Sequence, residues 1–411
     1  MVRSLSAARI IKAIGNSLSL KDSEIERLIH PEEFLDFDIT IEKDDGDFEV
    51  FKGYFCKHNS ILGPADVGIT FDDSIDADQI KEKAMYMMLK SALLELPFGG
   101  GAGGIALSLK YLSEDELKKA CREFAILISE LIGRDVSIVS SDYGTNEVII
   151  DWMVHESAKI RGLDDSKSCF MCKSVENDGI EFRGSALAIG VARIVDLVSR
   201  CFNNEGNVLK VAIQGYGNVG SSVAKSLSEL NAKIIGLSNT SGSIFCKSDE
   251  GFDPFEVLKY KAQGKGFSEI PGSNYDTDSN KVLNMDCDVL VLAAAKDQIT
   301  SQNADQVNAR IVVECANSAI TEEAVNILEK KGIVIIPNIL AQCGAVILNY
   351  FEYIQNLNNE HWTRDQVEQQ LFSKLDNIIS RINEIVSDKS ISFRQACYRK
   401  AISDLSSKIK Y

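Results

Sequence analysis

The sequence predicts an α/β protein of two domains, the first built around a mixed sheet and the second around a doubly wound parallel sheet. The chain has 411 residues, which at roughly 100–200 residues per domain is enough for two or three domains. Residues 37–105 begin with alternating apolar and polar positions, whereas residues 207–346 contain short apolar runs between helical stretches. Short buried runs that alternate with helices are typical of βαβ units in a parallel sheet.

Composition and charge restrict the class of protein. With 45% apolar residues, 25% charged residues and six prolines, the chain has the composition of a folded globular protein. Sixty acidic residues against 44 basic ones give a net charge of −16, which repels phosphate backbones and anionic membrane surfaces. No apolar run reaches the roughly 18 residues that span a membrane. We therefore expect neither nucleic acid nor membrane as a partner.

The ten cysteines lack the spacing of a disulfide framework, which indicates a reducing compartment. Only Cys169 and Cys172 are close in sequence. A single C-x-x-C pair without nearby histidines indicates zinc only weakly, because a structural zinc site needs four ligands. We predict no metal site and leave the role of this cysteine pair open.

Two interpretations exist for the first twenty residues. Met1–Leu20 carries three basic residues, several serines and no acid, as a mitochondrial presequence does. Apolar residues at 7, 10, 11 and 14 instead have helical spacing, and Asp22–Ile29 continues the same period. We favour an amphipathic first helix and a cytoplasmic protein.

Turn signals at 44–46 and 63–64 separate strands in the first domain. Helical patterns follow over Asp76–Leu96 and Ser113–Ile132, and Ser113-Glu-Asp-Glu is typical of a capping box. The tail from 364 to 410 is helical, and we expect it to pack on the first domain. In the second domain we expect strands over 208–213, 233–237, 289–294, 310–313 and 333–336.

A G-x-G-x-x-G pattern follows the first of these strands and opens a helix expected over 221–230. In this context the glycines permit a tight turn, close approach of a pyrophosphate and close packing of helix on strand, while the helix N-terminus supplies N–H donors. A purely structural glycine turn is the alternative, which the flanking strand and helix disfavour. The pattern predicts NAD or NADP binding in a Rossmann-type domain by Gly215, Gly217, Asn218, Val219 and Gly220.

The residue expected to bind the ribose 2′-hydroxyl is an acid at the end of the next strand. This chain has Asn239 there. A neutral side chain removes the repulsion against a 2′-phosphate, but no arginine stands beside it to hold one. The preference between NAD and NADP therefore stays open.

Further motifs occur in a fixed order along nearly the whole chain. With them the chain resembles the glutamate/leucine/phenylalanine/valine dehydrogenase family, in particular its glutamate-dehydrogenase branch. The motifs are Phe51-Lys-Gly-Tyr54, Gly63-Pro64, Lys83–Lys90, Pro97-Phe-Gly99-Gly100, Asp142-Tyr-Gly144-Thr145-Asn146, Asp286-Cys-Asp288, Ile311-Val-Val-Glu314-Cys-Ala-Asn317, Asn338-Ile-Leu-Ala341 and Tyr350-Phe-Glu352.

The resemblance implies a domain organisation and an assembly. It implies a substrate-binding and oligomerisation domain over 1–184, a dinucleotide-binding domain over 185–346 that includes Asn317, and C-terminal helices over 347–411 that return to the first domain. It also implies a homo- or hetero-hexamer. The small-molecule partner would be an amino acid or a 2-oxo acid.

In the family, hydride passes from the amino acid Cα to nicotinamide, and water then attacks the imine. The resemblance implies three lysines and an aspartate for this chemistry. Asp142 retains the aspartate position, which transfers protons, and Lys90 retains the lysine that holds the α-carboxylate. The lysine position for the side-chain carboxylate of glutamate holds Asp66, and the catalytic lysine position holds Ala102.

Other positions of the resemblance have also changed. Thr70 replaces an arginine, Leu187 replaces a threonine, and Asn349 replaces a serine that helps to bind the glutamate side chain. The linker at 171–174 keeps only Lys173. The glycines that shape the backbone mostly survive, whereas side chains that act in the chemistry have changed.

These changes weaken glutamate turnover for physical reasons. Ala102 can neither stabilise charge on the reacting oxygen nor activate water, and losing one such group typically costs about 10²–10³ in rate. Asp66 would meet the γ-carboxylate of glutamate with a like charge. Without a cationic partner Asp142 would lose the stabilisation of its charged form. As a replacement cation we consider Lys57, whose alternative role is that of an ordinary surface lysine.

Two functions follow. The first is a weakly active or non-catalytic subunit, regulatory or structural, beside an active dehydrogenase paralogue; a sensor that binds ligand without turnover overlaps with it. The second is an active NAD(P)-dependent amino-acid dehydrogenase of altered substrate, such as a cationic or polar amino acid that pairs with Asp66, using Asp142 and Lys90. Because the arginine, serine and threonine positions are lost together, we favour the first.

Overall fold

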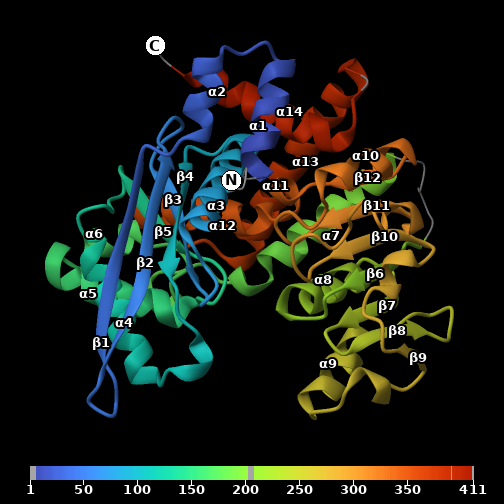
Figure 1. The fold of residues 1–411 in the computed structure, drawn as a ribbon, viewed down its shortest axis with the longest axis horizontal. Helices are drawn as coiled ribbons and strands as arrows, with labels where there is room; N and C mark the ends of the chain where they lie inside the picture. The colour runs from blue at the N-terminus through green and yellow to red at the C-terminus, as the bar shows by residue number, and fades with distance from the viewer. Residues whose placement is uncertain (1–5, 202–207, 390, 410–411) are drawn as a thin grey trace. The chain divides into compact units, whose positions relative to one another are not determined.

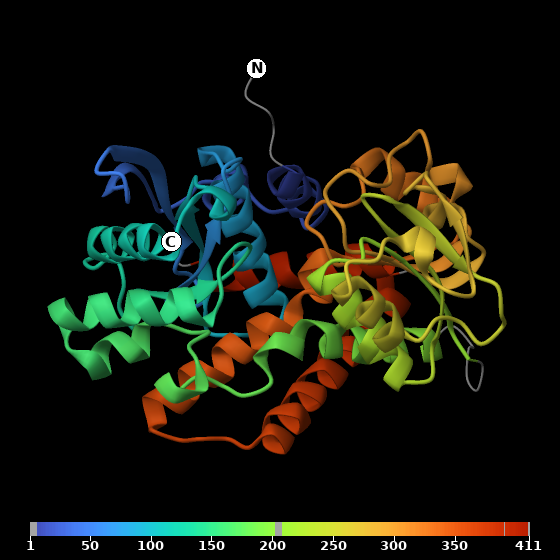
Figure 2. The ribbon, with the colours of Figure 1, turned by 90° about the horizontal axis from the view of Figure 1, so that it is seen from below.

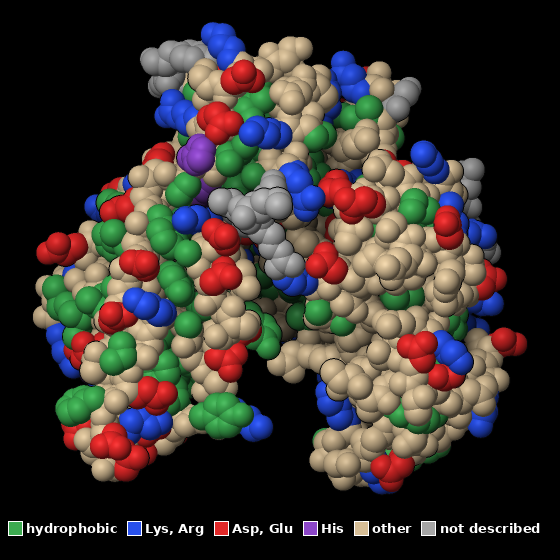
Figure 3. Space-filling model, in the orientation of Figure 1, with side chains coloured by type: hydrophobic (Ala, Val, Ile, Leu, Met, Phe, Trp, Pro, Cys, Tyr) green, Lys and Arg blue, Asp and Glu red, His purple; other side chains and the backbone are tan. Residues whose placement is uncertain are grey.

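The computed structural model describes residues 6–201, 208–389 and 391–409. The chain divides into two compact units. The first unit comprises Met1–Arg183, Val346–Gln369 and Tyr398–Tyr411, and the second comprises Gly184–Ala345 and Gln370–Cys397. In the described part of the chain, no helix is long and apolar enough to cross a membrane. Acidic and basic side chains are interspersed over the displayed surface of both units (Figure 3).

The first unit contains a five-stranded mixed sheet in the order β1-β2-β4-β3-β5 (Figure 1). The pairs β1–β2 and β2–β4 are antiparallel, whereas β3 pairs in parallel with both β4 and β5. This arrangement confirms the mixed sheet that the sequence predicts. The strands are β1 (Glu33–Glu42), β2 (Phe48–Asn59), β3 (Ala65–Phe71), β4 (Gly99–Ile105) and β5 (Ser137–Ser141).

The helices of the first unit begin and end largely where sequence signals place them. The first helix buries Ala7, Ile10 and Ile11, as the amphipathic interpretation predicts. Ser113 accepts a hydrogen bond from the backbone of Glu116 while the Glu116 side chain accepts one from Ser113, which confirms the capping box. These helices are α1 (Ser6–Ser17), α2 (Asp22–Ile29), α3 (Ala77–Leu93), η1 (Leu109–Tyr111), α4 (Glu114–Leu127), α5 (Glu147–Arg161), α6 (Leu163–Cys169), η2 (Val175–Asn177) and most of α12 (Cys343–Asn358).

Helix α3 lies directly on the backbone of β4. Five of the seven residues of β4 are glycine. A Cβ added at Gly100 would lie 2.5 Å from the carbonyl oxygen of Ala84 in α3, so no larger residue fits there without moving the helix. Ala102 packs in the same place, in an apolar cluster with Ile80 and Ala84. The glycine strand therefore sets how closely α3 approaches the sheet.

The second unit contains a seven-stranded sheet in the order β12-β11-β10-β6-β7-β8-β9. The five strands from β12 to β7 are parallel and include all five strands that the sequence predicts. Two short antiparallel edge strands, β8 and β9, were not predicted. The strands are β6 (Lys210–Gln214), β7 (Lys233–Asn239), β8 (Gly242–Cys246), β9 (Ser273–Asp276), β10 (Cys287–Leu292), β11 (Ala309–Glu314) and β12 (Val334–Ile336).

This strand order is that of a doubly wound sheet. The chain moves outward from β6 to β7 and later returns to the other side of β6 at β10, which places a topological switch point between β6 and β10. The remaining helices are α7 (Arg183–Cys201), α8 (Asn218–Glu229), α9 (Pro254–Ala262), η3 (Phe267–Glu269), η4 (Lys281–Asn284), η5 (Ala304–Gln306), α10 (Glu322–Lys330), α11 (Asn338–Ala341), α13 (Arg364–Lys389) and α14 (Phe393–Lys408).

The C-terminal helices differ from the expectation that all of 347–411 returns to the first domain. After α12 the chain passes through a loop into α13 (Figure 2), and Gln370–Cys397 belongs to the second unit. There Arg193 of α7 forms an ion pair of 2.6 Å with Asp376 of α13. Ion pairs between segments so distant in sequence cannot be inferred from helical periodicity.

Glu314, the last residue of β11, is a buried carboxyl group of the second unit. It is 3% exposed and accepts a hydrogen bond of 3.2 Å from the backbone of Ile320. Burial raises its pKa to about 7, although the charge of Arg394 opposes this shift. The folded state thus keeps a proton that the unfolded chain releases near its ordinary value of 4.5.

We expect Glu314 to make stability depend on pH. Because its pKa is raised on folding, its protonation favours the folded state fully below about 4.5, and this contribution is lost as pH rises through about 7. The free energy of unfolding of the wild type, measured by urea denaturation relative to Glu314→Gln, should therefore fall between these pH values. A difference between the two proteins that does not change with pH would contradict the prediction.

Candidate functional site

The predicted substrate-site residues of the first unit lie on neighbouring elements. In the β3–β4 pair Gly68 is opposite Ala102, and in the β3–β5 pair it is opposite Ser140. A Cβ added at Gly68 would lie 3.4 Å from the Cβ of Asp142, which directly follows β5. The sheet register therefore brings positions 102 and 142 to the same region of the first unit.

Asp142 has a cationic partner, contrary to the expectation from position 102. The Nζ atom of Lys83 on α3 lies 2.6 Å from Oδ2 of Asp142 and 2.8 Å from Oγ1 of Thr70. Thr70 in turn donates a hydrogen bond of 2.9 Å to the same Oδ2. Desolvation alone would raise the pKa of Asp142, but the charge and hydrogen bond of Lys83, with a smaller contribution from Lys90, lower it to about 2.

Lys83, and not the Lys57 that the sequence suggests, pairs with Asp142. Lys57 lies on β2, with its Nζ atom 3.7 Å from Glu32. Lys83 precedes the retained Lys90 by seven residues on one helix, a spacing of two turns that puts both side chains on the same face. That spacing was the available signal.

Lys90 itself is almost buried, at 7% exposure. Its charge opposes the rise that burial causes in the pKa of Asp66 and contributes to the lowered pKa of Asp142. Ala102, by contrast, is 2% exposed in its apolar cluster and offers only a methyl group. The ammonium groups that lower the pKa of Asp142 are those of Lys83 and Lys90, both on α3.

Asp66 is completely buried, and donors from the same chain satisfy it. Ser140 donates a hydrogen bond of 2.6 Å to its Oδ1, and Asn349 of α12 donates one of 2.8 Å to its Oδ2. Burial raises the pKa of Asp66, while these two hydrogen bonds oppose the shift. Because Asp66 is 0% exposed, a cationic ligand side chain could reach it only if the surrounding side chains moved, which disfavours the hypothesis of such a ligand pairing with Asp66.

A buried ion network continues from Asn349. Arg183 donates a hydrogen bond to Asn349 Oδ1 and another of 3.2 Å to Glu352. Glu352 also forms an ion pair of 2.7 Å with Lys173, and both side chains of this pair are fully buried. Backbone N–H groups of Cys172 and Lys173 donate to Glu352 as well. The network fastens the 171–173 linker to α12 and so fixes Asn349 beside Asp66.

The thiols of Cys169 and Cys172 contact different partners. Cys169 donates to the carbonyl oxygen of Asp165 at 3.1 Å, and Cys172 donates to Asn349 Oδ1 at 3.5 Å. All ten cysteines are free. The described residues contain no group of three or more histidine, cysteine, aspartate and glutamate side chains that could hold a metal ion. In this structure the pair contributes packing and hydrogen bonds.

In the second unit the glycine pattern forms a turn between β6 and α8, at the switch point of the sheet. Gly215 has a φ of +91°, and a Cβ there would lie 2.6 Å from the backbone nitrogen of Ala294 after β10. A Cβ added at Gly217 would instead meet nothing within 4 Å. The space beside Gly217 is therefore open to a ligand.

The start of α8 suits an anion. The helix begins at Asn218, earlier than expected, and its N-cap Gly217 makes no side-chain cap. The first N–H groups, including those of Asn218, Val219 and Gly220, have no intrahelical acceptors and can bind a pyrophosphate. The residues present thus fit the phosphates of a dinucleotide.

Two asparagines complete the predicted cofactor set. Asn239 ends β7, where the sequence places it, and its Oδ1 accepts hydrogen bonds of 2.8 and 2.7 Å from Ser241. Its amide nitrogen is the group left to contact a ribose. Asn317 accepts a hydrogen bond of 3.0 Å from Asn338 through its Oδ1.

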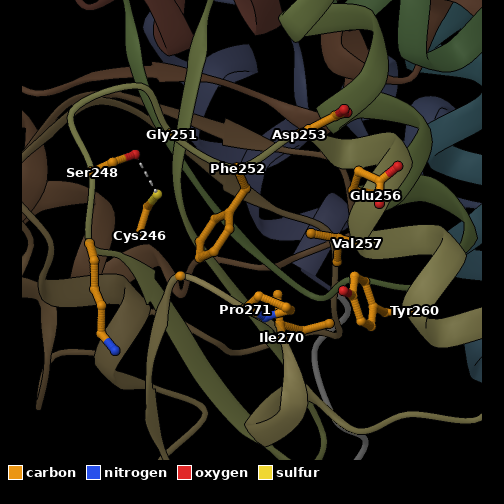
Figure 4. A pocket seen from close by; sticks show the side chains of 12 residues that line it. Cys246, Ser248, Gly251, Phe252, Asp253, Glu256, Val257, Tyr260, Ile270 and Pro271 are labelled. Atoms are coloured by element: carbon orange, nitrogen blue, oxygen red, sulfur yellow. Dashed lines mark hydrogen bonds between the residues drawn. The ribbon is translucent and has the colours of Figure 1, made fainter.

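The second unit also has a cavity of about 420 Å³ between the end of β8 and α9 (Figure 4). Phe252, Val257, Tyr260 and Ile270 give it an apolar wall, and Cys246 and Ser248 lie at one side. None of the predicted substrate or cofactor residues lines it.

Family models match most of the chain. Residues 179–411 match "Glutamate/Leucine/Phenylalanine/Valine dehydrogenase", and residues 31–159 match "Glu/Leu/Phe/Val dehydrogenase, dimerisation domain". The chain is 33% identical over 394 residues to the NAD-specific glutamate dehydrogenase of Staphylococcus aureus, covering 96% of this chain and 94% of the relative. It is 32% identical over 409 residues to the NADP-specific glutamate dehydrogenase of Synechocystis sp., covering 98% and 95%.

Solved structures show the same fold. A hetero-hexameric glutamate dehydrogenase from Thermus thermophilus, in a leucine-bound form, superposes with a TM-score of 0.92 at 26% identity and covers 100% of this chain and 97% of its own. The glutamate dehydrogenase of Peptoniphilus asaccharolyticus superposes with a TM-score of 0.85 at 28% identity, covering 98% and 97%.

We expect the buried pair of Lys173 and Glu352 to matter more for stability than any surface pair. Lys173→Met leaves Glu352 buried with less compensation, so the free energy of unfolding should fall by about 3–5 kcal/mol. The exposed pair of Lys259 and Glu256 supplies the control, because Lys259→Met should cost less than about 1 kcal/mol. Chemical denaturation of both variants tests this prediction. Equal losses in the free energy of unfolding would contradict it.

Proposed function

Because the chain belongs to the glutamate/leucine/phenylalanine/valine dehydrogenase family, we propose that it is a subunit of glutamate-dehydrogenase type with weak or no glutamate turnover. It binds NAD or NADP in its second unit and an amino acid or 2-oxo acid in its first. Its role is regulatory or structural.

The observation that carries this proposal is the replacement of two ammonium groups. Position 102 presents a methyl group inside an apolar cluster, and the family resemblance implies a catalytic lysine at this position. Removing one preorganised electrostatic group of this kind costs about 10²–10³ in rate. Position 66 presents a buried carboxyl group whose two oxygens already accept hydrogen bonds. It therefore offers no cation to the γ-carboxylate of glutamate.

The open space at Gly217 and the uncapped start of α8 support dinucleotide binding. When bound, the nicotinamide would accept or donate hydride. Relatives include both NAD-specific and NADP-specific enzymes. The neutral Asn239 lacks the acid that favours an unphosphorylated ribose, so both cofactors stay in the proposal.

Assembly and ligand follow from the same relatives. The hetero-hexamer from Thermus thermophilus was solved with leucine bound, which supports a homo- or hetero-hexamer for this chain and, in the second case, a place beside an active paralogue. In this proposal Lys90 holds the α-carboxylate of the ligand. A cytoplasmic location, where thiols stay reduced, suits the ten free cysteines.

A second function is favoured by one observation. Asp142 retains a cationic partner in Lys83, so its charged form is stabilised without a lysine at position 102. The chain could then be an active amino-acid dehydrogenase that deaminates a substrate other than glutamate. Asp142 would transfer protons and Lys90 would hold the α-carboxylate.

Turnover assays test the proposed function. The absorbance of reduced nicotinamide is followed with both cofactors, a panel of amino acids, and 2-oxo acids with ammonia. We expect kcat for glutamate to be at least about 10²-fold below that of the Staphylococcus aureus relative measured in parallel. Binding of the reduced cofactor is followed by its fluorescence, and circular dichroism serves as the folding control.

Ordinary enzyme rates with glutamate would overturn the proposal. Ordinary rates with another amino acid, and not with glutamate, would establish the second function instead. Absence of dinucleotide binding in a folded protein would remove the cofactor from the proposal.

A further inference from the structure

The side chains of Lys83, Asp142 and Thr70 form three mutual hydrogen bonds. Lys83 donates to Asp142 Oδ2 at 2.6 Å and to Thr70 Oγ1 at 2.8 Å, and Thr70 donates to the same Oδ2 at 2.9 Å. Thr70 is 1% exposed on β3 and cannot move freely. Lys83 is therefore tied to a buried group of the sheet as well as to Asp142, whose side chain is 43% exposed.

The position of Lys83 follows from the packing of α3. The next residue, Ala84, packs against Ala102 in one cluster, and the backbone of α3 at Ala84 lies directly over Gly100. The helix that covers position 102 thus carries an ammonium beside it.

We propose that Lys83 is the positioning residue of Asp142, and that it supplies from α3 the cation that the family supplies from the position of Ala102. It keeps the carboxylate of Asp142 ionised and held through Oδ2. This inference about Lys83 uses one part of the proposed function, namely that the region around Asp142 binds the amino acid. It holds whether or not the site turns ligand over.

One consequence concerns restoring the missing lysine. In the wild type a lysine introduced by Ala102→Lys would meet an Asp142 already paired with Lys83, close to the charge of Lys90. Two or three ammonium groups near one carboxylate repel one another. Ala102→Lys alone is therefore unfavourable, whereas Lys83→Met makes room for it.

Infrared titration of the carboxyl band tests the proposal without any ligand. Each protein is compared with its own Asp142→Asn counterpart, so that the difference reports Asp142 alone. In Lys83→Met the protonation midpoint of Asp142 should rise by about 1–3 pH units. The double variant Lys83→Met with Ala102→Lys should return it toward the wild-type value. The groups that face Asp142 besides Lys83 are Thr70 and Lys90, and neither is changed.

Lys81→Met is the matched control. It removes the same charge from α3, but Lys81 lies over the ring of Phe34, 4.2 Å from its centre. Its titration should match that of the wild type. The proposal is overturned if Lys83→Met leaves the midpoint unchanged, or if Lys81→Met shifts it equally.

If Lys83→Met does not fold, denaturation midpoints of variants that retain Lys83 test the proposal instead. With Lys83 intact, Ala102→Lys should lower the denaturation midpoint more than Ala102→Met, a side chain of similar length without charge. Equal losses would overturn the proposal. Fast glutamate turnover would overturn the proposed function and leave these results untouched, so the two failures are distinguishable.

Discussion

The contact of α3 with the glycine strand β4 is the constraint on which the first unit depends. A Cβ added at Gly100 would lie 2.5 Å from the carbonyl oxygen of Ala84, so the helix can approach this closely only because β4 has no side chain at that position. That approach places Lys83 near the ends of β3 and β5, where its Nζ atom contacts Thr70 and Asp142. The backbone of the site is thus set by glycines, independently of which side chains perform chemistry there.

On this scaffold the charges have been rearranged. A carboxyl group stands at position 66 with donors from Ser140 and Asn349, and a methyl group stands at position 102. The ammonium beside Asp142 comes from Lys83 on α3. Lys173 and Glu352 form a fully buried ion pair. Arg183 bonds both Glu352 and Asn349, and so links this pair to Asn349. In the proposed function, Lys90 holds a carboxylate and the start of α8 holds a dinucleotide, whereas position 102 lacks the ammonium group that the family resemblance implies for glutamate deamination.

The sequence predicts the parts of this structure that local pattern determines. The spacing of Gly215, Gly217 and Gly220 between a strand and a helix predicts the turn at the switch point, and Ser113 with Glu116 predicts a helix start. The strands β8 and β9 were not predicted, because the sequence was interpreted as parallel βαβ units only and these two strands pair antiparallel. The partners of individual side chains were not predicted for a different reason. Lys83 and Asp142 are 59 residues apart, and Asp66 and Asn349 are 283 residues apart, so only the folded chain reveals that they meet.

The most direct test of the rearranged pocket compares two ligands that differ only in charge at the end of the side chain. Glutamine carries an amide where glutamate carries its γ-carboxylate, so their affinities isolate the effect of position 66. Isothermal titration calorimetry with saturating dinucleotide gives both dissociation constants for the wild type and for Asp66→Lys. Our prediction is that the wild type binds glutamine more tightly than glutamate and that Asp66→Lys reverses this order. A wild type that prefers glutamate would contradict it.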